Sequence, residues 1–400
     1  MISPIRQAFF AKGLSALALA AMTSIATGTG ALAADPVKIG MVTTLSGPAG
    51  YLGEDARDGF MLAVAEEGGM LGGVPVDVMI EDDGLKPVNG KAIAERFLDK
   101  DKAEIITGVI FSNIAAVVAP MTLKAGSFYI SPNAAPSIFA GKKCDPDYFA
   151  VAWQNDTLHE TAGIDANNLG YKSAVILAPN YQAGKDALAG FKRYFKGEVK
   201  DEIYTKLGQT DYAAEIAKIR AAKPEMVFHF LPGGMGINFL KQYAQAGLKE
   251  SIPLVLGEPS ADLRIVTAVG DIALGIHSST HWNLDFDNEA SKTFVKGFEE
   301  KYGREPTVYA SQGYDTAKLI ASALKATGGK VLTDKDAFRA ALEKADFASV
   351  RGPFKFNTNH HPIMNWYDRL VMKEGDKIVN KTQGLIVENH QDAFVGECKM

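Results

Sequence analysis

Short polar segments follow several of the predicted strands and could together bind a small anion. Ser112 and Asn113 come directly after the apolar run 105–110, and Asn133 follows the run 127–131. Such loops lead into helix N-termini, where unpaired backbone N–H groups favour an anion such as a carboxylate. In open α/β sheets, ligands bind beyond the carboxyl ends of the strands. The three polar side chains are therefore candidate ligand-binding residues.

Aromatic and apolar side chains flank the same loops and could form the wall of a pocket. Such a mixture suits a small, partly apolar ligand. The side chains concerned are those of Tyr51, Leu52, Phe111, Tyr181 and Phe230. A purely structural role is the alternative for each loop, since Ser112 could act only as a helix N-cap and the glycines from Gly233 to Gly236 could only make a tight turn.

Motifs typical of enzymes are absent from the sequence. The loop 46–53 lacks the G-x-G-x-x-G spacing of dinucleotide binding, and no G-x-S-x-G elbow, Walker A loop or H-E-x-x-H helix occurs. The adjacent residues His360 and His361 cannot both face one site on a helix or strand, so we expect no metal there. The sequence therefore predicts no catalytic residue, no cofactor and no metal ion.

Three further residues have roles that depend on the fold. His229 lies inside an apolar run, where a hydrogen-bonded core histidine is the expected role. His281 and Trp282 lie where we expect the chain to cross between two sheets, so they could pack at a hinge or line a pocket.

Apolar runs rich in β-branched residues alternate with helix-period segments along most of the chain. Several runs are continuously apolar, as a parallel strand buried on both faces requires. Repeated strand–helix alternation with right-handed crossovers predicts a doubly wound α/β fold. The expected strands are 37–44, 74–82, 103–110, 127–131, 173–179, 226–231, 252–257, 368–373 and 378–387.

The strands fall into two groups, which predicts two sheets with separate cores. The segment 276–283 is expected to carry the chain back to the first sheet, where helices near 289–301 and 311–327 would complete a lobe. The predicted lobes are residues 35–152 with 282–354, and residues 153–281 with 355–400.

The first 34 residues have the order of charge and hydropathy of an export signal. Arg6 and Lys12 precede the apolar run 14–22, and small residues follow. A positive start, a short apolar middle and an A-x-A end are typical of a secretory signal peptide. Because the apolar run is shorter than the roughly 20 residues that span a bilayer, a membrane anchor is the less favoured alternative. We expect cleavage near Ala33 or Ala34 and a mature protein outside the cytoplasm.

The charge balance is mildly acidic. The 42 Lys and Arg residues and 47 Asp and Glu residues give a formal net charge of −5, and removal of Arg6 with Lys12 would make it −7. No basic patch stands out, so nucleic acid is not an expected partner. The chain has two cysteines, Cys144 and Cys398. In an exported chain such a pair favours a disulfide, with two buried free thiols as the alternative.

Several short motifs occur in the order in which a known family carries them. They are Val-Lys-Ile-Gly at 37–40, Ser-Gly-Pro at 46–48, Asp-Asp at 82–83, Gly108 with Ser112, Ile-Ser-Pro at 130–132, Gly-Tyr-Asp-x-Ala at 313–317 and Gly-Pro at 352–353. The chain thereby resembles periplasmic substrate-binding proteins of the branched-chain amino-acid-binding type. The resemblance implies two Rossmann-like lobes, joined by three crossovers, that close on a solute by a hinge motion. It also implies delivery to the membrane permease subunits of an ABC importer.

One departure from the family pattern bears on the ligand. Amino-acid binders of this type usually hold the substrate ammonium with a threonine hydroxyl, in a loop that here reads Asn133-Ala134-Ala135. The missing hydroxyl makes a free amino acid a less favoured ligand. Glu258 lies near the position of the family's ammonium-binding acid, so a branched-chain amino acid or an amide is the alternative ligand.

A second set of residues resembles one branch of the family. The wall of the second lobe is expected to include Phe230 and Leu231, and the glycine-rich segment 232–236 contains Gly233. Together with the loop 142–145 and Cys398, this segment looks like the branch associated with aromatic acids. The resemblance therefore implies a small carboxylate of benzoate or hydroxycinnamate type. A receptor's sensor domain and a solute-degrading enzyme are the interpretations from other functional classes.

Overall fold

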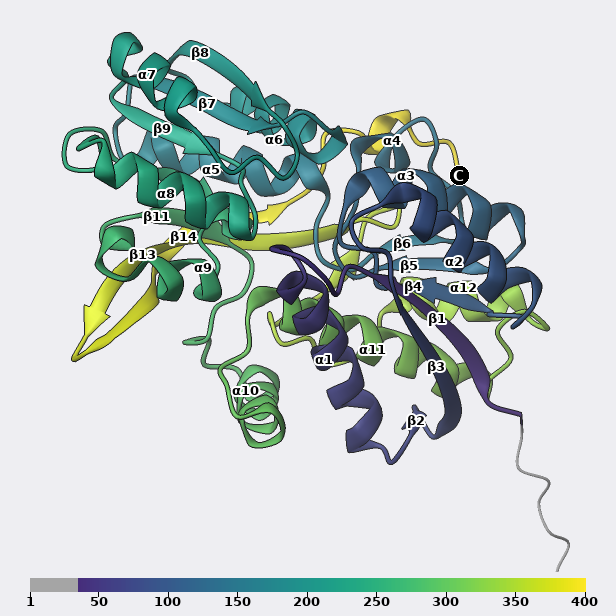
Figure 1. The fold of residues 1–400 in the computed structure, drawn as a ribbon. Coiled ribbons are helices and arrows are strands. Elements are labelled where there is room, and N and C mark those ends of the chain that lie inside the picture. Colours follow the sequence, from purple (N-terminus) through teal and green to yellow (C-terminus); the bar gives the residue numbers. More distant parts are fainter. Residues whose placement is uncertain (1–34) are drawn as a thin grey trace, which may run out of the picture. The chain divides into compact units, whose positions relative to one another are not determined.

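The structure is a computed structural model that describes residues 35–400 (Figure 1). The predicted signal peptide, with its cleavage site near Ala33 or Ala34, lies outside the described residues. Pro36–Met400 forms one compact unit. Within this part of the chain, no helix combines the length and the apolar character needed to cross a membrane.

Six strands form the first sheet. They are β1 (Val37–Thr43), β2 (Met70–Leu71), β3 (Val74–Asp82), β4 (Ile105–Thr107), β5 (Phe128–Ser131) and β6 (Tyr148–Ala150). Their spatial order is β2-β3-β1-β4-β5-β6, and all run parallel except the short β2. Because β3 and β4 flank β1 on opposite sides, the strand order reverses at β1. A doubly wound sheet binds its ligand at such a reversal.

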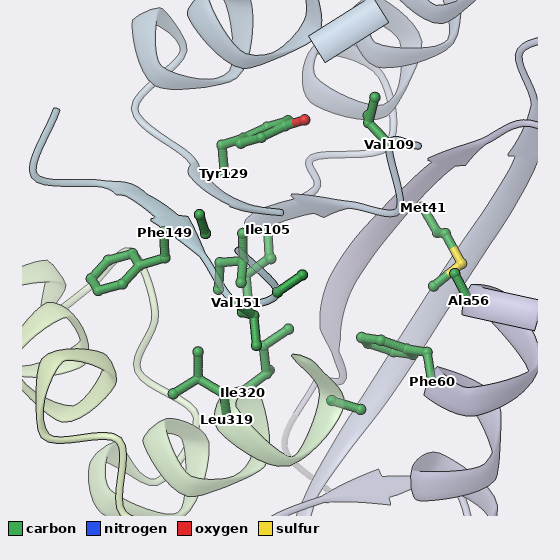
Figure 2. Packing of buried hydrophobic residues seen from close by; sticks show 14 of the residues in the cluster. Met41, Ala56, Phe60, Ile105, Val109, Tyr129, Phe149, Val151, Leu319 and Ile320 are labelled. Atoms are coloured by element: carbon green, nitrogen blue, oxygen red, sulfur yellow. The ribbon is translucent and has the colours of Figure 1, made fainter. Parts of the chain in front are cut away.

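Helices from two distant parts of the chain share the core of the first sheet. They are α1 (Tyr51–Glu66), α2 (Pro87–Asp99), α3 (Ser112–Lys124), α4 (Ser137–Ala140), α10 (Glu289–Tyr302), α11 (Val308–Thr327) and α12 (Lys335–Lys344). Figure 2 shows Phe60 of α1 and Leu319 of α11 in one buried cluster with Ile105 of β4. The predicted helices near 289–301 and 311–327, and their return to the first sheet, are confirmed.

Two glycines allow α1 and α11 to pack closely. A Cβ atom at Gly59 would lie 1.9 Å from the carbonyl oxygen of Ala310, and one at Gly313 would lie 1.9 Å from that of Ala56. Any larger residue would push the helices apart. The close approach fixes the start of α11, which carries Tyr309, against the first sheet.

Strands from the rest of the chain form two further sheets. They are β7 (Ser173–Pro179), β8 (Glu198–Thr205), β9 (Met226–His229), β10 (Val255–Gly257), β11 (His277–Thr280), β12 (Lys355–Phe356), β13 (Pro362–Glu374) and β14 (Lys377–His390). The sheet β8-β7-β9 is parallel, and the sheet β10-β11-β13-β12 continues through β14, which pairs with β13. A parallel bridge between Val227 and Leu254 places β9 beside β10.

Five α-helices accompany these two sheets. They are α5 (Asn155–Asn168), α6 (Gln182–Tyr194), α7 (Ala213–Ala222), α8 (Gly234–Gln245) and α9 (Leu263–Val269). The α5 and α6 helices pack against each other, and α5 also contacts β10 and β11. The molecule is therefore a mixed α/β protein with separate cores, as the alternation of strands and helices predicts.

Most predicted strands agree with the observed ones, with two informative exceptions. The predictions 74–82 and 173–179 match β3 and β7. The prediction 103–110 is too long, since β4 ends before Gly108, whose φ of 93° leaves the strand conformation. Strand β8 was not predicted, because three charged residues, 200–202, separate its apolar residues Val199 and Ile203, so it contains no continuous apolar run.

A buried arginine joins two of the segments that cross between the sheets. Arg351 donates hydrogen bonds to the carbonyl oxygens of Ala152, at 2.7 Å, and Val151, at 2.8 Å. In a third contact, the rings of Trp153 and His281 meet edge to face with centroids 5.3 Å apart. Residues near 152, 281 and 351 are therefore in contact where the chain passes between the two halves of the molecule.

The C-terminal segment is attached to the first sheet. Cys144 and Cys398 form a disulfide across 254 residues of sequence, which confirms the predicted pairing. The side-chain amide of Asn359 also donates to the carbonyl oxygen of Ala140 at 2.8 Å and to Asp392 Oδ2 at 3.0 Å. The disulfide therefore joins the C-terminal segment to Cys144 in the loop that follows α4.

Candidate functional site

A cavity lies between the first sheet and the α5, β7 and β9 elements. The space in and around it that no protein atom fills, including open solvent at its mouth, is about 400 Å³. Its walls come from the residues that follow β4, β5, β7 and β9, together with the starts of α5 and α11. The carboxyl ends of parallel strands therefore meet here, as expected for a ligand site in this class of fold.

Polar side chains at one end of the cavity form a connected network. Asn155 Nδ2 donates to Ser112 Oγ at 3.0 Å and lies 3.0 Å from Asp186 Oδ2. Asn155 Oδ1 accepts a hydrogen bond from the Ala135 backbone N–H at 3.2 Å. Nearby, Asn133 Nδ2 donates to Gln312 Oε1 at 2.7 Å, which ties this loop to α11. The network fixes the orientation of Ser112, Asn133 and Asn155, all of which line the cavity.

Helix N-termini surround the same end. Ser112 is the first residue of α3, and Asn155 is the first residue of α5. The backbone N–H groups of Ile114 and Ala115 bond to the Phe111 carbonyl oxygen. Within residues 35–400, the N–H groups of Ser112 and Asn113 have no such backbone acceptor. Free N–H groups and the helix dipole together favour a bound anion.

Aromatic rings form a continuous row along the cavity. The ring centroids of Phe111 and Tyr181 lie 6.3 Å apart, and those of Tyr181 and Phe230 lie 6.4 Å apart with nearly parallel planes. His159 meets Phe230 edge to face at 4.9 Å. Trp153 adds a further ring to the wall. Such spacings are typical of interacting aromatic side chains and suit a planar ring as the bound group.

Among residues 35–400, no charged side chain lines the cavity. Two acids are in contact with or adjacent to wall residues. Asp186 accepts hydrogen bonds from Asn155, Ser137 and Gln182, and burial raises its pKa. Burial, and then the charge of Asp186, raises the pKa of Asp156 to about 7. A bound anion would therefore be held by neutral hydroxyl, amide and N–H groups.

The structure brings six of the residues expected to bind ligand to the cavity wall. These are Leu52, Phe111, Ser112, Asn133, Tyr181 and Phe230. The others lie outside the wall: Tyr51, Asn113, Ala134, Ala135, Leu231, Gly233 and Glu258. The backbone N–H of Ala135 bonds to the wall residue Asn155. Gly233 has a φ of 68° and packs against Ala49.

Tyr51 contacts the opposite half of the molecule instead of the cavity. Its hydroxyl donates to Asp262 Oδ2 at 2.6 Å, and the Arg264 guanidinium lies 5.1 Å from the centre of its ring. Arg264 Nη2 also lies 2.5 Å from Asp55 Oδ1. These contacts connect α1 to the start of α9 and hold the two walls of the cavity together.

Glu258 is fully buried and already has protein partners. Glu258 Oε2 lies 2.7 Å from His281 Nδ1, and Glu258 Oε1 accepts a hydrogen bond from the Thr280 hydroxyl. Arg369 Nη1 lies 3.8 Å from Glu258 Oε1. It is the next residue, Pro259, that lines the cavity. In this arrangement the carboxylate is not available to a ligand ammonium.

Sequence reasoning missed several residues of the wall. They are Ile110, Trp153, Asn155, Leu158, His159, Ala183, Pro259 and Tyr309, with Pro232 named only as part of a turn. Asn155 and His159 were not predicted because they lie on α5, a helix that follows a crossover, and not in a loop that follows a strand. The local sign of these wall residues in the sequence is the polar pair Gln154 and Asn155, which directly follows the buried run 148–153.

The histidines outside the cavity have structural roles. His229 is buried, but neither ring nitrogen has a hydrogen-bond partner among the described residues, so the prediction of a hydrogen-bonded histidine is wrong. It packs edge to face against Phe239. His281 packs against Trp153 at the crossover between the sheets, and it also lines a second, polar cavity. His360 lies flat on Phe149, with centroids 4.1 Å apart.

Trp282 is buried and anchored to α10. Its indole N–H donates to Ser291 Oγ at 2.9 Å, and its ring meets Phe294 edge to face. It does not line the cavity described above.

One group of side chains has the composition of a metal site. Asp165, His277 and Asp368 each place one possible ligand atom within 4.8 Å of the others. His277 Nδ1 lies 3.0 Å from Asp368 Oδ2, so a histidine–aspartate ion pair accounts for two of the three residues. Burial raises the pKa of Asp165 to about 7, with Asp368 contributing. The group is separate from the cavity and from the predicted ligand residues.

The chain matches known proteins over nearly its whole described length. The family model for periplasmic binding proteins matches residues 36–371. The Leu/Ile/Val-binding protein homolog 6 of Brucella melitensis is 29% identical over 375 residues, which cover 90% of this chain and 94% of the relative.

Solved structures resemble the fold closely. An ABC-transporter solute-binding protein from R. palustris, in complex with benzoate, is 32% identical with a TM-score of 0.86, and the match covers 92% of this chain and 100% of that chain. A second R. palustris solute-binding protein, in complex with 4-hydroxybenzoate, is 28% identical with a TM-score of 0.84, over 90% of this chain and 99% of that chain. The resemblance inferred from the short motifs is thereby confirmed. The chain belongs to the periplasmic binding protein family and has its type I fold, two doubly wound lobes joined by three crossovers.

Proposed function

We propose that this protein captures a small aromatic carboxylate in the periplasm and presents it to the permease subunits of an ABC importer. Capture is non-covalent and needs no cofactor, so the protein is a binding component and not an enzyme. The predicted signal peptide supports export of the chain. The R. palustris solute-binding proteins, which bind benzoate and 4-hydroxybenzoate, support the ligand class.

The observation that carries the proposal is the composition of the cavity wall. Free N–H groups at the start of α3, with the Ser112 hydroxyl and the Asn133 amide beside them, suit a carboxylate. The row of rings from Phe111 to Phe230 suits an aromatic body. A ligand that is anionic at one end and aromatic along its length matches both parts.

The energies are sufficient for useful affinity. Burial of about 150 Å² of apolar ring surface contributes roughly 4 kcal/mol, at about 25 cal/mol per Å². Hydrogen bonds to a charged group contribute about 1.5–3 kcal/mol each. Micromolar binding requires about 8 kcal/mol. One ring and one carboxylate with two hydrogen bonds can therefore supply it.

Closure of two lobes is the proposed mechanism of capture. We assign residues 35–152 and 282–354 to the first lobe, and residues 153–281 and 355–400 to the second. Contacts between them support a closed arrangement: the Gly234 N–H donates to the Pro48 carbonyl oxygen at 3.2 Å, and Tyr51 donates to Asp262. A ligand that contacts both lobes would shift the equilibrium towards this closed form.

A branched-chain amino acid is the second candidate ligand. The name of the Brucella relative, a Leu/Ile/Val-binding protein homolog, favours it. The engagement of Glu258 by His281 and Thr280 disfavours it, because an ammonium group would lack a free carboxylate. The absence of charged side chains from the wall disfavours it further.

A ligand panel distinguishes the two candidates. The purified protein, unfolded and refolded to remove retained ligand, is titrated with benzoate, 4-hydroxybenzoate, a hydroxycinnamate and leucine by isothermal titration calorimetry. We expect micromolar or tighter binding of at least one aromatic acid, with a matching rise in Tm, because a ligand stabilises the state it binds. Binding of leucine without binding of any aromatic acid would contradict the proposal.

A further inference from the structure

His159 is a buried polar side chain in the cavity wall without a protein partner. Only 2% of its surface is exposed, and it contacts the rings of Phe228 and Phe230 edge to face. Nδ1 has no hydrogen-bond partner among the described residues. A buried imidazole without partners costs free energy unless another group satisfies it. The other ring nitrogen, Nε2, is the one that a ligand in the cavity could satisfy.

The backbone at Gly257 determines which edge of the ring faces the cavity. A Cβ atom at residue 257 would lie 2.8 Å from Nδ1 and 3.0 Å from Cε1 of His159. The Nδ1 edge is therefore packed against the end of β10. This arrangement leaves Nε2 as the nitrogen that can reach the cavity.

The surroundings of the ring keep it uncharged. Burial lowers the pKa of His159 to about 3, so the imidazole is neutral at the pH of any ordinary binding experiment. A neutral imidazole offers one N–H donor and one acceptor nitrogen. It does not supply the positive charge that would favour a carboxylate at this end, which is lined by Leu158 and Phe230. A hydroxyl group can donate to or accept from Nε2, whichever tautomer is present.

His159 and Asn155 both line the cavity from α5. They are four residues apart on α5, so they lie on one face of the helix and about 6 Å apart along its axis. Asn155 belongs to the polar network with Ser112. A carboxylate near Ser112 therefore places the far end of an aromatic ring towards His159.

We propose that His159 Nε2 forms a hydrogen bond with a ring hydroxyl of the bound aromatic acid, so that the protein selects hydroxylated over unsubstituted aromatic acids. This assignment rests on the proposed function. It adds the class of substrate within the aromatic acids and the residue that selects it.

The test compares two acids that differ by one hydroxyl group. Dissociation constants for benzoate and 4-hydroxybenzoate are measured by calorimetry on the wild-type protein and on His159→Phe, which keeps a ring of similar shape. His229→Phe is the matched control, because His229 is also buried without hydrogen-bond partners but lies outside the cavity wall. His159→Gln, which keeps a hydrogen-bonding amide, is a second variant of different shape.

We expect the wild-type protein to bind 4-hydroxybenzoate at least about tenfold more tightly than benzoate, since an unpaired buried polar group is costly. His159→Phe should abolish this preference, whereas His229→Phe should retain it and leave both affinities within about threefold. His159→Gln should keep part of the preference.

Equal losses for both acids in His159→Phe would overturn the assignment, since they would place the carboxylate at His159. An unchanged preference in His159→Phe would overturn it as well. A wild-type protein that binds benzoate and 4-hydroxybenzoate equally would overturn this inference but leave the proposed function intact. Binding of no aromatic acid at all would overturn the proposed function itself.

Discussion

The two ends of the cavity are built from different chemical groups. At the polar end, Ser112 and Asn155 begin helices and belong to one hydrogen-bond network. At the aromatic end, Phe230 and Leu158 present hydrocarbon beside the buried imidazole of His159. The difference supports the proposed ligand, which has two unlike ends. A zwitterion with two charges close together fits this division less well than an aromatic acid does.

The largest loss of affinity is expected at the aromatic end. Phe230→Ala removes a ring that contacts Tyr181 and His159, and we expect binding of aromatic acids to weaken about 10- to 100-fold. Phe195→Ala is the control, since Phe195 is 7% exposed against 6% for Phe230 and shares its core cluster but does not line the cavity. Calorimetry should show a large change in Kd only for the first variant. Equal losses would mean that general destabilisation causes the effect.

At the polar end we expect a smaller loss that is the same for every carboxylate. Ser112→Ala removes the hydroxyl that accepts from Asn155, and binding of both benzoate and 4-hydroxybenzoate should weaken about tenfold. Ser131→Ala is the control, because the Ser131 hydroxyl is also buried but bonds to the Ala134 carbonyl oxygen outside the wall. A loss confined to 4-hydroxybenzoate would reverse the assignment of the two ends.

The contact between the walls should matter less than either end. Tyr51→Phe removes the hydroxyl that donates to Asp262 Oδ2, so closure should be weaker and Kd should rise about threefold. Tyr302→Phe is the control, since its hydroxyl donates to the Asp58 carbonyl oxygen within the first lobe as assigned above. Stopped-flow measurements should show the change mainly in the dissociation rate. An unchanged Kd in Tyr51→Phe would separate this contact from ligand capture.

The smallest effect on binding is expected at the Asp165 group, which lies away from both ends. Asp165→Asn should leave Kd within about twofold, but it should alter the pH dependence of stability. The folded-state pKa of Asp165 is raised from 3.8 to about 7, so the folded state holds a proton that the unfolded state has released between these values. Stability should therefore fall as pH rises from about 4 to 7.

Thermal unfolding at pH 5 and pH 8 tests this effect. The wild-type Tm should fall between these pH values, and Asp165→Asn should remove part of that fall, because an amide does not titrate. Asp156, whose pKa is also raised to about 7, should account for part of what remains. The same fall in Tm for the variant and the wild-type protein would contradict the assignment.

The fold was largely predictable because its strands carry continuous apolar runs. The run in β7 has no exposed residue, so its parallel, doubly covered position follows from the sequence. The edge strand β8 has no such run and was missed. The disulfide was predictable from the number of cysteines and the expected compartment, since a pair of cysteines in an exported chain favours a bridge.

The cavity was predictable only in part, for a different physical reason. Residues that directly follow a strand, such as Ser112 and Tyr181, lie where the topology places ligands. Tyr309 reaches the wall because α11 packs against α1 through Gly59 and Gly313, which is a long-range contact. His159 reaches it through a helix that follows a crossover. No local pattern encodes the position of Tyr309, and the only local sign of His159 is the polar pair Gln154–Asn155 at the start of its helix.

A crystal structure of the protein with bound 4-hydroxybenzoate tests the central claim most directly. The account predicts the acid in the cavity between the lobes, with its carboxylate within hydrogen-bond distance of the Ser112 hydroxyl or the N–H groups at the start of α3. Its ring should lie beside Tyr181 and Phe230. An acid bound outside this cavity, or bound with its carboxylate against His159 and its ring at Ser112, would contradict the account.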